Sequence, residues 1–393
     1  MQQKMNHIPR RRIEHRTFRS LEESPVTALL GARQVGKTTL ARKIAVATST
    51  VHYYDLERAA DRAALSTPEI ALSDLSGLII IDEIQRIPLL FEVLRPLCDR
   101  EPLPARFLVL GSASHDLVRG VSETLAGRVQ FISMSGFRID EIDPEEQTKL
   151  WVRGGFPRSF LASNSEVSDR WRESFIATFL ERDLPQLGIR VSAEKLRRFW
   201  LMLAHYHGKI LNTSELAASM GVSQKTIGHY LDILSGAYVV RILPSWFENI
   251  KKRQVKSPKI YIRDSGLLHH LLGITTIEIL RSHPTYGASW EGFALEQVLA
   301  LRGERWAFYW RTQRGAELDL MVVDRTQRYG FEFKCSDAPS MTKSMHISLE
   351  DLQLSGISVI YPGASKYKMH EKVTAIPLSM LPELASDTFT PHH

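Results

Sequence analysis

The chain of 393 residues has little cysteine, no long apolar segment and no strong excess of one charge. Its two cysteines, Cys98 and Cys335, are too few for a disulfide framework and fit a reducing compartment. No apolar stretch approaches the roughly 20 residues that span a bilayer. The basic run at 10–12 is not followed by the apolar segment of a signal peptide. We therefore expect a soluble, cytoplasmic protein that has no membrane partner.

The bulk composition constrains the architecture more than the function. Hydrophobic residues make up 44% of the chain and charged residues 24%, as in ordinary globular proteins. A chain of this length exceeds what one hydrophobic core holds, so two or three domains are expected. The net charge of +6 is a mild bias towards polyanionic partners. The chemistry therefore has to be inferred from local motifs.

A glycine-rich loop lies between an apolar run at 26–30 and a helical pattern that continues to Ala45. From Gly31 to Thr38 it has the spacing Gly-x-x-x-x-Gly-Lys-Thr of a P-loop, in the strand-loop-helix context that such a loop requires. Main-chain N–H groups and the helix dipole would hold the phosphates of ATP, with Lys37 on the β- and γ-phosphates and Thr38 on Mg²⁺. The expected nucleotide-binding residues are Gly31, Ala32, Arg33, Gln34, Val35, Gly36, Lys37, Thr38 and Thr39.

An apolar strand at 78–83 ends in two adjacent carboxylates. Its unbroken Leu-Ile-Ile-Ile run is typical of a strand that is buried on both faces of a parallel sheet. Open α/β sheets bind ligands at the carboxyl ends of such strands. We therefore expect Asp82 to hold Mg²⁺ and Glu83 to polarise the attacking water. Both motifs predict the α/β class, with a P-loop parallel-sheet ATPase domain.

Two further candidates follow in the same region. The strand at 107–114 ends in small polar residues, and Ser112 or Ser114 would contact the γ-phosphate or the attacking water, or would cap a helix instead. Arg128 follows a glycine near the start of a strand. It would neutralise transition-state charge, in cis or from a neighbouring subunit of a homo-oligomer, unless it is an ordinary surface arginine.

The stretches GARQVGKTTL, LIIIDEIQRIP, FLVLGSAS and ETLAGR together resemble the predicted prokaryotic ATPases of the AAA superfamily. In that family an ATPase domain is followed by a conserved C-terminal region of unknown function. The similarity continues through GGFP, FLERDL and KIYIRDSGLL and so covers nearly the whole chain. The resemblance implies an ATP hydrolase that uses ATP and Mg²⁺.

Residues 212–234 have the form of a helix-turn-helix. Thr213 or Ser214 would cap the first helix, Gly221 would make the turn, and Ser223 would cap the second helix. Residues 236–243 would add the strand of a wing. This pattern predicts a helical and winged-helix domain in the middle of the chain.

The winged-helix region has side chains suited to DNA. Residues 250–263 contain six basic residues and no acidic residue, which fits contact with a duplex backbone. A winged helix is also a packing module between an ATPase and its effector domain, and then the partner would be a protein. The expected nucleic-acid-binding residues are Gln224, Lys225, Lys251, Lys252 and Arg253.

Histidines occur as close pairs in two places. His205 and His207 lie two apart, and His269 and His270 are adjacent. Neither pair has cysteines or a third ligand at the spacing of a zinc site. Structural or surface roles are therefore expected for these side chains.

The stretch ELDLMVVDRTQRYGFEFK, residues 317–334, predicts two strands. Residues two apart in a strand share a face, as Glu317 and Asp319 do on the first and Glu332 and Lys334 on the second. With the helix at 289–303, it resembles the restriction-endonuclease-like core, whose signature is an acidic residue followed by Glu-x-Lys. The resemblance implies that Glu291, Asp319 and Glu332 hold Mg²⁺ or Mn²⁺ while Lys334 stabilises charge. The alternative is a solvated face with cross-strand ion pairs. The candidate catalytic residues of the chain are Lys37, Glu83, Arg128, Asp319, Glu332 and Lys334.

Three functions fit these patterns: an ATP-dependent enzyme of DNA processing or defence, a nucleotide-switched regulator whose nuclease-like domain is inactive, and an ATPase whose partner is a protein. The domain organisation can be written as a series of ranges. We expect a basic segment at 1–25, an AAA-type ATPase domain at 26–148, a winged-helix domain at 149–265, an α/β nuclease-like domain at 266–385 and a tail at 386–393.

Overall fold

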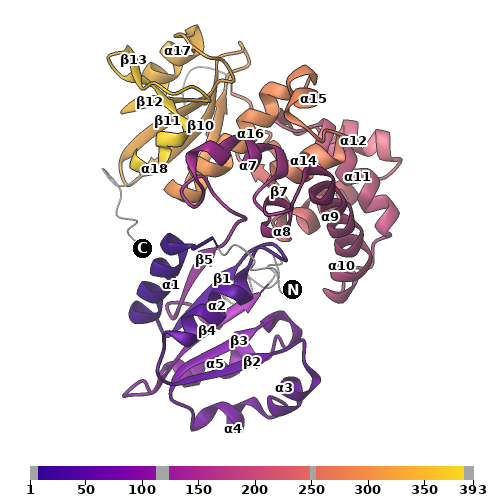
Figure 1. Cartoon of the computed structure of the whole chain (residues 1–393), viewed down its shortest axis with the longest axis vertical. Helices are drawn as coiled ribbons and strands as arrows, with labels where there is room; N and C mark the ends of the chain where they lie inside the picture. Colours follow the sequence, from indigo (N-terminus) through magenta and orange to yellow (C-terminus); the bar gives the residue numbers. More distant parts are fainter. Residues whose placement is uncertain (1–7, 112–123, 248–253, 385–393) are drawn as a thin grey trace. The chain divides into compact units, whose positions relative to one another are not determined.

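The computed structural model describes residues 8–111, 124–247 and 254–384 (Figure 1). The chain forms two compact units, of which the first comprises Met1–Gly136 with Asp232–Tyr238. The second comprises Phe137–Leu231 with Val239–His393. Among the helices of the described ranges, none has both the length and the apolar character needed to cross a bilayer.

The first unit is built on a parallel sheet of five strands in the order β2-β3-β4-β1-β5. The strands are β1 (Val26–Leu30), β2 (Val51–Asp55), β3 (Gly77–Asp82), β4 (Ala105–Gly111) and β5 (Val129–Ser133). All neighbouring pairs are parallel, so the carboxyl ends of the strands lie at one edge. β4 separates β1 from β3, which places the ends of these two strands about 10 Å apart. This confirms the predicted mixed α/β class and the parallel sheet.

Helices precede and connect these strands. They are α1 (Arg11–Glu23), α2 (Lys37–Val46), α3 (Ala59–Ala64), α4 (Pro68–Ser73), the 3₁₀ turn η1 (Ile84–Arg86) and α5 (Leu90–Cys98). Pro68 begins α4, where its missing N–H breaks no helical hydrogen bond. The alternate side chains Ile79 and Ile81 of β3 pack with α5 in the apolar core of the unit. The core thereby fixes β3, which ends at Asp82, directly before Glu83.

The second unit begins with helices. They are η2 (Pro144–Glu146), α7 (Gln147–Arg153), α8 (Pro157–Phe160), α9 (Ser165–Thr178), the π-helical η3 (Phe179–Asp183), α10 (Leu184–Gln186), α11 (Ala193–His205), α12 (Thr213–Met220), α14 (Ser265–Leu271) and α15 (Ile277–Ser282). The helix α13 (Gln224–Gly236) begins in the second unit, and its residues from Asp232 onward belong to the first. Gly221, with φ 67°, ends α12 in the left-handed region that glycine tolerates. The side chain of Asn212 caps α12, so the predicted caps Thr213 and Ser214 are wrong. Ser223 accepts the N–H of Thr226 at 3.1 Å at the start of α13.

A small antiparallel sheet accompanies α12 and α13. Its strands are β6 (Lys209–Ile210), β7 (Val240–Leu243) and β8 (Lys259–Ile262), in the order β6-β8-β7. β7 starts four residues later than the predicted wing strand at 236–243, because α13 continues to Gly236. The helices α12 and α13 and the strands β7 and β8 thus follow one another along the chain.

The larger sheet of the second unit has six strands in the order β13-β14-β12-β11-β10-β9. Its elements are α16 (Tyr286–Arg302), β9 (Ala307–Arg311), β10 (Glu317–Asp324), β11 (Gln327–Phe333), α17 (Lys343–Asp351), β12 (Gly356–Tyr361), β13 (Tyr367–His370), β14 (Val373–Pro377), η4 (Leu378–Met380) and α18 (Leu381–Leu384). β9, β10 and β11 are antiparallel, and β11 pairs in parallel with β12. Leu318 and Met321 of β10 pack with Met345 of α17 in its core.

Two of the motifs noted in the sequence, GGFP and KIYIRDSGLL, contact each other in the second unit. The carboxylate of Asp264 caps α14 and accepts the N–H of Gly155 at 2.8 Å. A Cβ atom on Gly154 would lie 2.2 Å from Asp264 Oδ1, and one on Gly266 would lie 2.1 Å from the carbonyl oxygen of Arg153. Both glycines are therefore required by close packing, which gives these motifs a structural role.

Candidate functional site: the P-loop and the acidic cluster

The loop 31–36 leaves β1 and enters the N-terminus of α2. Gly36 has φ 101° and Gln34 has φ 63°, both in the left-handed region. A Cβ atom on Gly31 would lie 2.1 Å from the carbonyl oxygen of Met134, so only glycine fits there. The first N–H groups of a helix have no intrahelical partner, and at α2 they can bind phosphate oxygens.

Arg10 holds this loop in place, although in the sequence it stands out only as part of a basic run at 10–12. The guanidinium group, 8% exposed, donates to the carbonyl oxygen of Val35 at 3.2 Å. It also donates to the carbonyls of Ser135 at 2.8 Å and Gly136 at 2.9 Å. The P-loop is thus tied to the segment that follows β5.

Lys37 lies under the loop and is 5% exposed. Its Nζ atom donates to the carbonyl oxygens of Gly31 and Ala32, both at 2.9 Å. Burial lowers the pKa of Lys37 to about 8, although Glu83 and Asp82 act in the opposite direction. The ammonium group is therefore placed at the loop by carbonyl dipoles that a triphosphate can replace.

Asp82 ends β3 and is 3% exposed. Its Oδ2 atom accepts hydrogen bonds from the Thr38 hydroxyl at 2.8 Å and from the Tyr53 hydroxyl at 2.9 Å. Its Oδ1 atom is buried and has no hydrogen-bond partner. A buried carboxylate oxygen without a partner is costly, and a bound cation removes that cost. Thr38 and Asp82 therefore fit a Mg²⁺ ion that accompanies a nucleotide.

Glu83 follows directly and has φ 58°, a left-handed conformation that is rare for a residue with a side chain. The amide of Gln85 donates to its carboxylate. Burial raises the pKa of Glu83, whereas Lys37 opposes the shift. Strained backbone and a shifted carboxylate pKa cluster at functional sites. The arrangement suits a group that accepts a proton from water.

Arg128 lies at the amino-terminal ends of the strands, whereas the P-loop lies at their carboxyl ends. β5 begins at Val129, which is paired with Val26, and the N–H of Val26 donates to the carbonyl oxygen of Arg128 at 3.0 Å. The five residues of β1 therefore separate it from the P-loop, a distance of roughly 15 Å. Its guanidinium binds Asp99 at 2.6 and 2.8 Å. The structure does not bring Arg128 to the nucleotide site of its own chain.

Other predicted contacts fall on different parts of the chain. β4 ends at Gly111, beside Leu30 at the P-loop edge, while the predicted contact Ser112 lies outside the described residues. Gln224 and Lys225 are exposed at the start of α13. The candidate DNA contacts Lys251, Lys252 and Arg253 also lie outside the described residues.

In the second unit, charged side chains meet in what we call the acidic cluster: Glu291, Glu317, Asp319 and Glu332 with Lys259 and Lys334. The Nζ atom of Lys334 lies 2.7 Å from Glu332 Oε2 and 3.9 Å from Asp319 Oδ2. Asp319 is 8% and Glu332 3% exposed. The interpretation of these charges as a solvated face is therefore wrong, because α16 and β8 cover them.

Burial has electrostatic consequences for this cluster. It raises the pKa of Glu332 to about 8, with Asp319 adding to the shift. Burial and Asp319 also raise the pKa of Glu291. Glu332 Oε1 is buried without a hydrogen-bond partner.

Lys259 and Tyr261 of β8 belong to the cluster, although in the sequence they stand out only as part of a basic stretch. Lys259 Nζ lies 3.0 Å from Glu291 Oε1, 2.6 Å from Glu317 Oε1 and 3.8 Å from Asp319 Oδ1. The Tyr261 hydroxyl donates to Glu291 Oε1 at 2.6 Å. Their alternation, two apart on a strand, was the available signal.

The arrangement does not fit the metal site that the sequence predicted at Glu291, Asp319 and Glu332. Within residues 8–111, 124–247 and 254–384, no group of three or more His, Cys, Asp or Glu side chains is arranged to hold a metal ion. Lys259 already lies among these carboxylates. At the P-loop the requirement is different, because the phosphates of a nucleotide supply further ligands.

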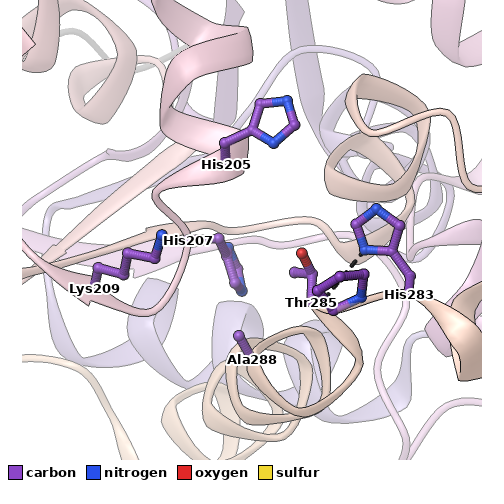
Figure 2. Close-up of a pocket in the computed structure, with 7 residues that line it drawn as sticks. His205, His207, Lys209, His283, Thr285 and Ala288 are labelled. Atoms are coloured by element: carbon purple, nitrogen blue, oxygen red, sulfur yellow. Dashed lines mark hydrogen bonds between the residues drawn. The ribbon is translucent and has the colours of Figure 1, made fainter.

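A cavity of about 450 Å³ in the second unit is lined by His205, His207, Lys209, His283, Pro284, Thr285 and Ala288. His207 is buried, its Nδ1 atom accepts the N–H of Ile262 at 3.0 Å, and burial lowers its pKa to about 3. Figure 2 shows the hydrogen bond in which His283 Nδ1 accepts the N–H of Thr285 at 3.1 Å. Both imidazole rings accept hydrogen bonds from backbone N–H groups, which supports a structural role for these two histidines.

The parallel sheet, the P-loop and the acid pair define a P-loop ATPase. A family model described as an AAA domain matches residues 23–143. Two models described as domains of unknown function, DUF8612 and DUF4143, match residues 144–278 and 286–381. The Walker-type ATPase of Pyrococcus abyssi shares the fold, with a TM-score of 0.50 and 15% identity over 68% of this chain and 97% of its own.

Two relatives that match nearly the whole chain place it in a family. They are uncharacterized proteins of Mycobacterium bovis and Mycobacterium tuberculosis, each 50% identical over 374 residues. The matches cover 95% of this chain and 85% of each relative. The chain belongs to the same family as these two proteins, and its N-terminal part is an AAA-type ATPase domain.

Proposed function

We propose that the first unit binds ATP with Mg²⁺ and hydrolyses it. The observation that carries this proposal is the hydrogen bonding of the two carboxylate oxygens of Asp82. One carboxylate oxygen is held by Thr38 and Tyr53, while the other is buried without a partner beside the P-loop. Such an atom favours a cation at the point where a P-loop places the phosphates of a nucleotide.

Each side chain has a distinct role in this mechanism. The N–H groups at the start of α2 hold the phosphates, and Lys37 exchanges its two carbonyl partners for phosphate oxygens. Thr38 and Asp82 would hold Mg²⁺, which would supply positive charge at the phosphates. Glu83 orients the attacking water and accepts its proton.

Substitution of Glu83 and Lys37 tests the proposal. Glu83→Gln removes the proton acceptor and should lower ATP turnover by at least about 100-fold while nucleotide binding persists. Lys37→Ala should abolish binding itself. The matched control is Glu69→Gln, an exposed glutamate on α4. Turnover by Glu83→Gln protein at the control rate would refute the role of Glu83.

We further propose that α12, α13 and the small sheet form a winged helix that binds duplex DNA. Support comes from the order of helices and strands, from exposed Gln224 and Lys225, and from the basic residues 251–253. Binding should weaken steeply with salt, because contacts to phosphates release counterions. Replacing Lys251, Lys252 and Arg253 by alanine should flatten that dependence. Absence of DNA binding at low salt would instead indicate a protein partner.

For the C-terminal domain we propose a nuclease-like architecture without cleavage in the described arrangement. The order α16, β9, β10, β11, α17, β12 supports the architecture, and the position of Lys259 supports the inactivity. The function is then that of a nucleotide-switched regulator that contacts DNA. Purified protein with ATP and Mn²⁺ should leave plasmid DNA intact. Nicking that disappears in the Lys334→Ala variant would overturn this proposal.

A further inference from the structure

Three carboxylates of the acidic cluster surround one ammonium group. Lys259 Nζ lies 3.0 Å from Glu291, 2.6 Å from Glu317 and 3.8 Å from Asp319. The lysine is 3% exposed, so water screens these interactions little. The chain itself therefore supplies the positive charge at the centre of the cluster.

The backbone of Lys259 is held on both sides. β8 lies between β6 and β7, and Lys259 is paired with Ile210 on one side and Leu243 on the other. The next side chain on the same face, Tyr261, is fixed to Glu291 at 2.6 Å. Further along, Arg263 lies 3.3 Å from Glu296 of α16. Withdrawal of the ammonium group would therefore require β8 to move or the lysine side chain to find another rotamer.

Charge balance indicates what Lys259 replaces. Four carboxylates of the cluster face three cations, namely Lys259, Lys334 and Arg311, which lies 3.2 Å from Glu317. With Lys259 absent and all four carboxyl groups ionised, two cations would remain, and one divalent ion would balance the charge. The buried oxygen Glu332 Oε1, which has no hydrogen-bond partner, offers a further ligand.

We propose that Lys259 is the resident cation of the acidic cluster and excludes divalent cations from it. Mn²⁺ or Mg²⁺ then enters only when Lys259 is replaced or withdrawn. This assigns a role to Lys259, the first residue of the motif KIYIRDSGLL. Its position on β8 places the ammonium group beside carboxylates of α16 and β10. This inference concerns occupancy by a cation. It is independent of ATP hydrolysis, and its failure is distinguishable from a failure of the plasmid test because no DNA is needed.

The test is a Mn²⁺ titration of nucleotide-free protein, in which electron paramagnetic resonance measures the concentration of free Mn²⁺ at each step. Lys259→Met protein should bind one additional Mn²⁺ per chain, at least tenfold more tightly than any site in the wild type. Lys256→Met is the matched control, because Lys256 is an exposed lysine whose Nζ lies over the ring of Phe247. The added site should vanish when Asp319→Asn is combined with Lys259→Met.

Loss of a buried lysine also destabilises the second unit, so thermal unfolding is measured in parallel. Mn²⁺ should raise the melting temperature of Lys259→Met protein and leave that of Lys256→Met protein unchanged. A folded Lys259→Met variant without the added site would overturn the proposal. A separate measurement on the wild-type protein tests the proposal without the Lys259→Met variant. Mn²⁺ binding by wild-type protein that Asp319→Asn abolishes would also overturn it.

Discussion

The Tyr53 hydroxyl donates a hydrogen bond to Oδ2 of Asp82, the carboxylate that we propose holds Mg²⁺. If Mg²⁺ bound the Thr38 hydroxyl, the hydrogen bond from the Tyr53 hydroxyl to Asp82 at 2.9 Å would still orient the carboxylate. Tyr53→Phe removes a hydrogen bond to a charged group, worth about 1.5 kcal/mol. The Mg²⁺ concentration for half-maximal ATP turnover should therefore rise about tenfold, with little change at saturating Mg²⁺.

The neighbouring tyrosine supplies the control for this titration. Tyr54 packs against the apolar core of the first unit, so Tyr54→Phe keeps the contacts of Asp82. Its Mg²⁺ dependence should match that of the wild type. Equal shifts in both variants would mean that the effect is one of general stability.

Lys37 predicts a pH dependence at the same site. Its pKa of about 8 in the protein lies below its ordinary value, and a bound triphosphate stabilises the ammonium form. Nucleotide binding therefore takes up a proton above pH 8, and the affinity should fall by up to about tenfold per pH unit from there. Below pH 8 the lysine is protonated in both states and contributes no slope. Titrations of a fluorescent ATP analogue between pH 7 and 9.5 measure the effect, and a constant affinity across that range would contradict it.

At the scale of elements, the contact between GGFP and α14 should control the stability of the second unit. A Cβ atom on Gly266 would lie 2.1 Å from the carbonyl oxygen of Arg153, so Gly266→Ala forces α14 away from α7. We expect the free energy of unfolding to fall by about 3 kcal/mol. Gly287→Ala is the control, because a Cβ atom there meets nothing within 4 Å and lies in a helix. Urea denaturation of both variants measures the difference, and equal midpoints would contradict the packing argument.

At the scale of the whole molecule, Arg128 lies too far from the P-loop of its own chain to contact that nucleotide. The remaining prediction is that it neutralises transition-state charge at the nucleotide of a neighbouring subunit. Arg128→Ala chains should then bind ATP and turn it over at least about tenfold more slowly. Mixing them with Glu83→Gln chains should restore turnover, because a mixed interface joins an intact Glu83 to an intact Arg128.

The ion pair with Asp99 provides the control for that mixing experiment. Asp99→Ala breaks the same pair but keeps the arginine, so its turnover should stay near that of the wild type. Turnover that fails to recover in mixtures of the two inactive variants would eliminate the role in trans. Recovery would also establish that the chain forms a homo-oligomer.

The sequence by itself determined the elements whose signals are local. The P-loop and the strand at 78–83 follow from spacing and apolar runs, which is why the ATPase class could be predicted and is confirmed. The turn at Gly221 likewise depends on the conformation of one residue. These features involve neighbours along the chain, so composition and period suffice to find them.

Only the tertiary structure decided which distant residues meet. Strand pairing brings the Tyr53 hydroxyl to Asp82. It places Arg128 at the amino-terminal ends of the strands, away from the P-loop at their carboxyl ends. In the second unit, β8 carries Lys259 into carboxylates more than thirty residues away along the chain, and it turns a predicted cation site into an ion-paired one. The physical reason is that charge and burial depend on partners that strand pairing selects, and a linear pattern does not specify them.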